Sequence, residues 1–185
     1  MEMIGNPQVF AVQLGWHREP VSYKPWMYGV FSVSVCGERL GSPSEEAVLN
    51  DILVDLHGWK NGVGRRCDPA LMAADPVTAF LSIEEEAYGL EHLADMIPPG
   101  FTPVSVPPLN SLEILGVDTL ESHRIYCVED DATSRLLYAR KWELPRECRV
   151  PRAVLADVLN QTIERLDGWF KQLPEPPGET PDGPA

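Results

Sequence analysis

Ile4-Gly5-Asn6-Pro7 leads into Phe10-Ala11-Val12-Gln13-Leu14, and a second segment carries Trp26-Met27-Tyr28-Gly29-Val30-Phe31. The first segment places a turn directly before an apolar run, which predicts a strand over residues 9–14. A second strand is expected over residues 28–35, because its small polar and its apolar side chains alternate with a period of two. This alternation indicates a sheet with one buried face.

Two amphipathic helices are expected after these strands. The segment Ser42-Pro43-Ser44-Glu45-Glu46 supplies a capping serine and first-turn acids, and apolar residues follow at spacings of three and four. Those residues are Val48, Leu49, Ile52, Leu53 and Leu56. A second helix is expected from Asp75-Pro76, where Asp75 caps the helix and Pro76 fits the first turn.

The rest of the chain predicts a loop, three strands and a long helix. Residues 96–110 are rich in proline, which predicts an irregular connection. Strands are expected over residues 114–117, 123–128 and 135–142. The polar residues 129–133 favour a hairpin between the last two strands. The longest helix is expected from Pro151, because an apolar stripe continues from there to Phe170.

This order of elements predicts an α+β fold, with a mostly antiparallel sheet and amphipathic helices packed on one face. Residues 1–173 are expected to form a single domain. Residues 174–185 are rich in proline, glycine and acids, which predicts a disordered tail. The four cysteines are widely spaced and form no C-x-x-C pair, so we expect small buried thiols in a reducing cytosol.

The first residues have no basic opening followed by an apolar core, and no stretch approaches eighteen apolar residues. We therefore expect neither an export signal nor a membrane span, and a cytoplasmic location. The formal net charge is −13, and the acids concentrate in the centre of the chain, where residues 44–100 contain eleven acids and three bases. Direct binding of nucleic acid needs clustered Lys and Arg, so a basic protein is the expected partner.

The four histidines are the first candidates for a general base, and none of them lies in a known catalytic motif. The segment Gly62-Val63-Gly64-Arg65-Arg66 lacks the Lys-Ser/Thr ending of a phosphate-binding loop. Three consecutive acids at 84–86 point in different directions on a helix and are a poor metal site. The sequence therefore predicts a protein that is not an enzyme and that holds no metal or cofactor.

The opening Ile-Gly-Asn-Pro turn, the Phe-Ala-Val run and the later Tyr-Gly-Val-Phe strand together resemble the immunity protein 42 family of bacterial polymorphic toxin systems. The resemblance covers Ile4 to about Trp59. It implies a cytosolic α+β inhibitor that is encoded beside a toxin and blocks the toxin's active site or the access of its substrate. Six motif positions would then determine the fold: Gly5, Pro7, Phe10, Tyr28, Gly29 and Phe31.

If this resemblance holds, acidic residues would face a basic cleft of the toxin, and complementary charge would speed the encounter. The expected contacts form two groups. One group is Glu84, Glu85, Glu86 and Tyr88, and the other is Glu129, Asp130 and Asp131 on the hairpin.

Two other classes of function remain open at this point. One is an enzyme or a small-ligand-binding domain whose site combines dispersed residues, with His92 or His123 beside a carboxylate. The other is a structural adaptor that delivers a toxin to secretion machinery, which would bind the toxin without neutralising it.

Overall fold

The computed structural model describes residues 1–185 except 18–25, 43–45, 108–112, 115–122, 141–142 and 175–185. The elements are β1 (Glu2–Asn6), β2 (Phe10–Trp16), β3 (Tyr28–Val35), β4 (Glu38–Leu40), β5 (Ala47–Val48), α1 (Leu49–Asn61), α2 (Pro69–Ala73), α3 (Pro76–Tyr88), the 3-10 helix η1 (Glu91–Met96), β6 (His123–Glu129), β7 (Thr133–Arg140), β8 (Arg146–Pro151) and α5 (Arg152–Phe170). They form an α+β fold, as the sequence predicts.

The strands of the described residues form two antiparallel sheets. The larger sheet has the order β1-β2-β3-β4, and β5 also pairs with β3. The smaller sheet has the order β6-β7-β8, with Cys127 opposite Leu136 and Leu136 opposite Cys148. The hairpin predicted at residues 129–133 is confirmed as the connection between β6 and β7.

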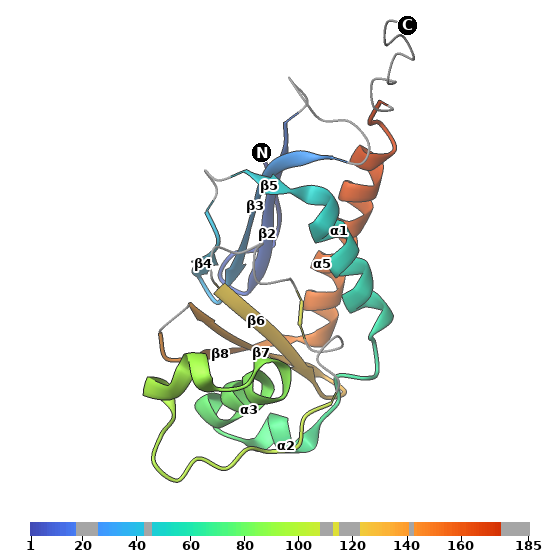
Figure 1. Ribbon diagram of the computed structural model, residues 1–185. Helices are drawn as coiled ribbons and strands as arrows, with labels where there is room; N and C mark the ends of the chain where they lie inside the picture. The colour runs from blue at the N-terminus through green and yellow to red at the C-terminus, as the bar shows by residue number, and fades with distance from the viewer. Residues whose placement is uncertain (18–25, 43–45, 108–112, 115–122, 141–142, 175–185) are drawn as a thin grey trace, which may run out of the picture.

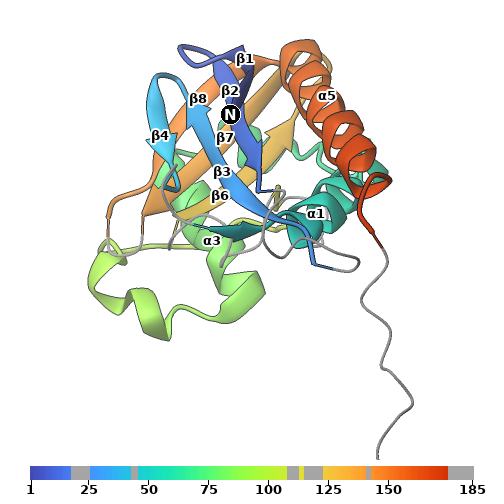
Figure 2. The same cartoon turned by 90° about the horizontal axis from the view of Figure 1, so that it is seen from above.

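Helices cover the two sheets differently. Figure 1 shows α1 and α5 side by side against the larger sheet, with the smaller sheet below it and α2 and α3 beneath that. The view from above in Figure 2 shows α5 running along the β1–β2 side of the larger sheet. The smaller sheet is therefore a middle layer.

Alternation along β6 explains how the middle layer buries both of its faces. Ile125 and Cys127 point into the larger core, which joins both sheets to α1 and α5. Tyr126 and Val128 point the other way, into a second core with Leu71, Ala79, Phe80 and Ile83 of α2 and α3. Both faces of a strand that is covered on each side must be apolar, and β6 is buried from Ile125 to Glu129.

Four of the six motif positions, Gly5, Phe10, Gly29 and Phe31, have the structural role that the resemblance implies. Gly5 has φ +95, and a Cβ there would meet the carbonyl oxygen of Phe10 at 2.5 Å and Val158 at 2.8 Å. A side chain at Gly29 would collide with the backbone of Gly15 on the neighbouring strand. Phe10 is fully buried and Phe31 almost so. Glycine at positions 5 and 29 thus allows β1, β2, β3 and α5 to approach closely.

Several predicted boundaries were wrong. Helix α1 begins at Leu49 and has no side-chain cap, because β5 precedes it directly. Residues 43–45 of the expected capping segment lie outside the described residues, as do most of the predicted 114–117 strand and the predicted tail beyond Pro174. The Asp75 cap is confirmed, because its Oδ1 accepts hydrogen bonds from the backbone N–H groups of Val77 and Thr78 at 3.1 and 3.0 Å.

Short elements were missed. β1, β4, β5, α2 and β8 contain two to six residues each, which is too short for a clear periodic pattern. Pro151 ends β8 and precedes α5 rather than occupying its first turn.

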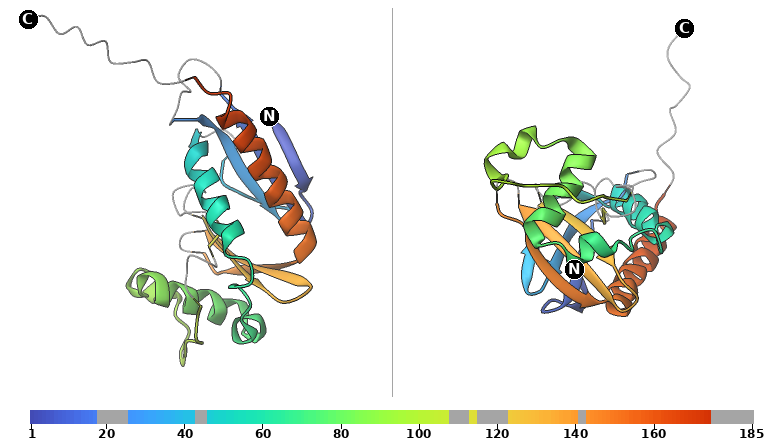
Figure 3. Two further views of the ribbon diagram at one scale, coloured as in Figure 1. Left: turned by 90° about the vertical axis from the view of Figure 1, so that its right-hand side faces the viewer. Right: turned by 90° about the horizontal axis from the view of Figure 1, so that it is seen from below.

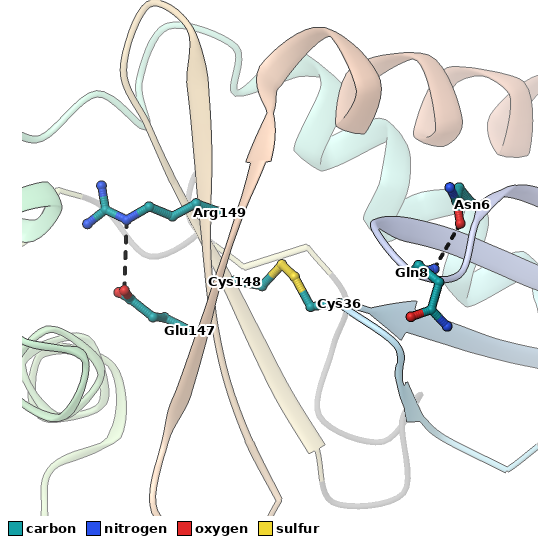
Figure 4. Close-up of a disulfide and its surroundings, with 6 residues drawn as sticks. All are labelled: Asn6, Gln8, Cys36, Glu147, Cys148 and Arg149. Carbon is teal, nitrogen blue, oxygen red and sulfur yellow. Dashed lines mark hydrogen bonds and ion pairs between the residues drawn. A yellow bond between two sulfur atoms is a disulfide. The ribbon is translucent and has the colours of Figure 1, made fainter.

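The expectation of four buried thiols was wrong for three of the cysteines. Cys36 and Cys148 form a disulfide between the β3–β4 turn and β8, with their Cα atoms 6.1 Å apart (Figure 4). Cys67 is a free and exposed thiol, whereas Cys127 is free and buried as expected. Spacing along the chain could not reveal the pair, because 112 positions separate the two bonded cysteines.

Candidate partner-binding surface

Glu84 lies at the centre of a buried polar cluster between α3 and β6. Its Oε1 accepts a hydrogen bond from the Tyr126 hydroxyl at 2.7 Å, and its Oε2 lies 3.3 Å from Nη1 of Arg124. Nε2 of His92, from η1, lies 3.2 Å from the same oxygen. Glu84 has no exposed surface, so its carboxylate positions the surrounding groups and is not itself available to a partner.

Tyr88 is held on the surface by this cluster. The Arg124 guanidinium lies 4.1 Å from the centre of the Tyr88 ring, in cation–π geometry. The Tyr88 side chain is 43% exposed, although partial burial and the nearby Glu113 raise the pKa of its phenol. Burial and the neighbouring Glu84 raise the pKa of Tyr126 far above its ordinary value, so Tyr126 remains a hydrogen-bond donor. An exposed aromatic ring supported by a buried ion pair is a preorganised contact residue.

The stretch of chain around Tyr88 is strongly acidic. Glu85 and Glu86 of α3 are exposed, and so are Glu91 and Asp95 of η1. Together with Tyr88 we call these four residues, which belong to the C-terminal half of α3 and to η1, the acidic face. Residues 67–107 contain seven acids and no lysine or arginine, so nothing within this stretch neutralises the face.

The second predicted group is divided between the interior and the surface. Glu129 is only 2% exposed, and its Oε2 lies 3.1 Å from Nε of the fully buried Arg66. Arg152 approaches the same oxygen at 3.6 Å. This carboxylate therefore joins the loop after α1 to the end of β6 and the start of α5.

Asp130 and Asp131 are exposed on the β6–β7 hairpin. Oδ1 of Asp130 accepts hydrogen bonds from the backbone N–H groups of Ala132 and Thr133, at 2.8 and 2.6 Å. These bonds hold the pKa of Asp130 below its usual value and shape the turn. Arg124 lies near the start of β6 and Glu129 at its end, so about 17 Å of extended strand separates the two predicted groups.

The histidines show no catalytic arrangement. His57 lies 3.4 Å from Asp167 on α5, His17 lies 3.5 Å from Glu46, and His92 shares Glu84 with Arg124. In the described ranges, no group of three His, Cys, Asp or Glu residues could hold a metal ion. No helix in the described part of the chain is long and apolar enough to cross a membrane.

Sequence reasoning missed the arginines that organise both groups. Arg66 belongs to the segment that lacks the ending of a phosphate-binding loop. It instead donates to the Trp59 carbonyl at 2.6 Å, and its guanidinium lies 4.3 Å from the Trp59 ring centre. Arg124 belongs to no recognised motif. Its position two residues before Tyr126, directly before the apolar residues 125–128 of the strand, was the available signal.

Comparisons with known proteins agree with this architecture. The sequence matches the immunity protein 42 family over residues 1–165, well beyond the Ile4–Trp59 region that carries the visible motif. A solved structure of CdiI from Burkholderia dolosa has a similar fold, with a TM-score of 0.67 and 17% identity over 89% of this chain and 99% of that chain. No curated protein matches the sequence.

These findings define a class of protein, the immunity proteins of bacterial toxin systems, which bind cognate toxin domains and are not enzymes. The chain belongs to the immunity protein 42 family.

Proposed function

We propose that this protein acts in the cytoplasm, where it binds a basic toxin domain encoded by the neighbouring gene and blocks the toxin's active site or the access of its substrate. The observation that carries the proposal is the acidic face, whose charge is not neutralised by any lysine or arginine in residues 67–107. A surface of one sign attracts a partner of the opposite sign and raises the rate of productive encounters.

The proposed contacts follow the exposure of the predicted residues. Tyr88 is the proposed anchor, and Glu85 and Glu86 provide exposed negative charge on the same helix. Glu84 acts through Arg124, which it holds under the Tyr88 ring. Asp130 and Asp131 form a second, separate contact, and Glu129 supports that hairpin from within.

Co-expression tests the function. The chain would be expressed with the toxin domain encoded next to it, and growth and complex formation would be measured together. We expect restored growth and a complex that survives purification. A complex without restored growth would point to an adaptor, and a neighbour that is neither toxic nor bound would refute the proposal.

Charge reversal tests the acidic face. We expect the E85K/E86K double variant to associate with the toxin domain more slowly and with a weaker dependence on salt. The matched control is D51K/D157K, which makes the same change in net charge at exposed positions of α1 and α5. Equal association rates for the two double variants would remove the acidic face from the interface.

A further inference from the structure

The outer edge of β1 is a second surface suited to a partner. β1 pairs with β2 from Glu2 opposite Leu14 to Asn6 opposite Phe10, and none of the described strands pairs with its other edge. The β1 sequence contains neither proline nor lysine, two residues that commonly protect an exposed strand edge. Its unpaired backbone N–H and C=O groups can therefore accept another strand.

A cavity of about 400 Å³ lies beside this edge, between β1 and α5. Its lining consists of Glu2 and Ile4 from β1, Gln161, Glu164, Arg165, Gly168 and Trp169 from α5, and Gln172 just beyond α5. Figure 3 (left) shows β1 beside α5 at the outer side of the molecule. We call this cavity and the adjoining edge the β1 groove.

The position of the groove matches what a strand added to β1 would require. Such a strand would lie about 4.8 Å from β1, and its alternate side chains would point to the side of the sheet that α5 covers. Glu2 and Ile4 already point to that side, since both line the groove. Gly168 lines the groove, and the space next to it is open, since a Cβ there would meet nothing within 4 Å.

Charge in the groove selects the occupant. Arg165 is already paired with Glu2 at 2.8 Å, whereas Glu164 has no ion-pair partner among the described residues. An added strand with a lysine or arginine opposite Glu164 would neutralise it. A second copy of β1 would instead bring another glutamate, Glu2, into an acidic groove, so pairing between two copies is disfavoured.

We propose that an extended, basic segment of the toxin polypeptide adds to the free edge of β1 and places a lysine or arginine beside Glu164 in the β1 groove. This inference rests on the proposed function, because it takes the toxin as the partner. The β1 groove and the acidic face lie on different sides of the molecule, so variants can test them separately (Figure 3).

The test fills the groove without disturbing the fold. Gly168→Leu places a side chain in the cavity, and leucine favours a helix more than glycine does, so thermal stability should not fall. The matched control is Gly58→Leu on α1. A Cβ at Gly58 also meets nothing within 4 Å, and Gly58 does not line the groove. Binding to the purified toxin domain from the neighbouring gene would be measured for both variants and the wild type.

We expect Gly168→Leu to weaken binding at least about tenfold, mainly through faster dissociation, and Gly58→Leu to bind like the wild type. Hydrogen exchange of the Glu2–Asn6 amides should slow in the wild-type complex. If the wild type binds the toxin domain, Gly168→Leu binds it equally well, and hydrogen exchange of β1 does not change in the complex, this inference alone would be overturned. Absence of wild-type binding would overturn the proposed function as well.

The association state of the chain alone provides a further outcome. A dimer that dissociates on Gly168→Leu substitution would assign the β1 edge to a second copy and overturn the toxin-strand inference. Ultracentrifugation of the wild type and both glycine variants would detect such a dimer.

Discussion

The disulfide between Cys36 and Cys148 allows a quantitative prediction about stability. The bond closes a loop of 112 residues and connects the larger sheet to the smaller one. Reduction would add two electrons and two protons and leave two thiols, with the folded contacts otherwise retained. The perturbation therefore acts mainly on the unfolded chain, which regains the freedom that the closed loop removed.

The chain-entropy relation assigns about 5 kcal/mol at 25 °C to a loop of 112 residues. For a chain of this size each kcal/mol corresponds to a change of about 2–4 °C in melting temperature. We therefore expect reduction by a dithiol, or the Cys36→Ser/Cys148→Ser double variant, to lower the melting temperature by about 10–20 °C. Cys67→Ser is the control, and its effect should be under about 0.5 kcal/mol because Cys67 is free and exposed.

Thiol counting accompanies the melting measurement. The oxidised chain unfolded without reductant should show two reactive thiols, and the reduced chain four. In the native protein only Cys67 should react readily, because burial and the nearby Glu129 raise the pKa of Cys127 to about 12. Alkylation in intact cells would show which form a reducing cytoplasm maintains. Four thiols in the purified, unreduced chain, or equal stability with and without the bond, would refute the reasoning.

Two further predictions concern single carboxylates. Asp75→Ala should cost about 1 kcal/mol at pH 7, measured by urea unfolding, because it removes the cap of α3. Hydrogen bonds from Thr78 hold the pKa of Asp75 in the folded protein below its ordinary value of 3.8. The stability that Asp75 contributes is therefore present above pH 3.8 and is lost as the pH falls through the pKa of the folded state, so wild type and variant should converge in acid. A constant difference in stability down to about pH 2 would contradict this. Glu84→Leu should cost about 3–5 kcal/mol, since it leaves Arg124 and Tyr126 without their buried partner. A loss below about 1 kcal/mol in the same assay would show that the cluster is not structurally important.

Much of the architecture could be predicted from local patterns. The alternation over residues 28–35 and the long stripe before Phe170 correspond to β3 and α5, because burial on one side imposes a period of two on a strand and of 3.6 on a helix. Asp75-Pro76 marked the start of α3, because capping depends only on neighbouring residues. The two motifs resembled those of the family, and the structure gives their glycines a physical role, because a side chain at Gly5 or Gly29 would collide with backbone.

The candidate surface was less accessible to sequence reasoning. Glu84 and Glu129 were grouped with exposed neighbours as contacts, yet each lies in the interior beside an arginine that is distant in sequence. A run of acidic residues in the sequence indicates negative charge, but it does not indicate which of the carboxylates points into the protein interior. That choice depends on the packing of α3 on β6 and of the residue 66 loop on the hairpin.

The sequence by itself determined the fold class, the family, the acidic character of the central region and the caps and turns that depend on neighbouring residues. Tertiary structure alone decided that the described strands form two sheets rather than one, that Cys36 meets Cys148, and that one edge of β1 is left unpaired by those strands beside a groove lined by α5. The physical reason is the range of the interactions. Periodicity and capping act over a few residues, whereas disulfides, buried ion pairs and grooves join segments whose separation along the chain carries no information about their distance in space.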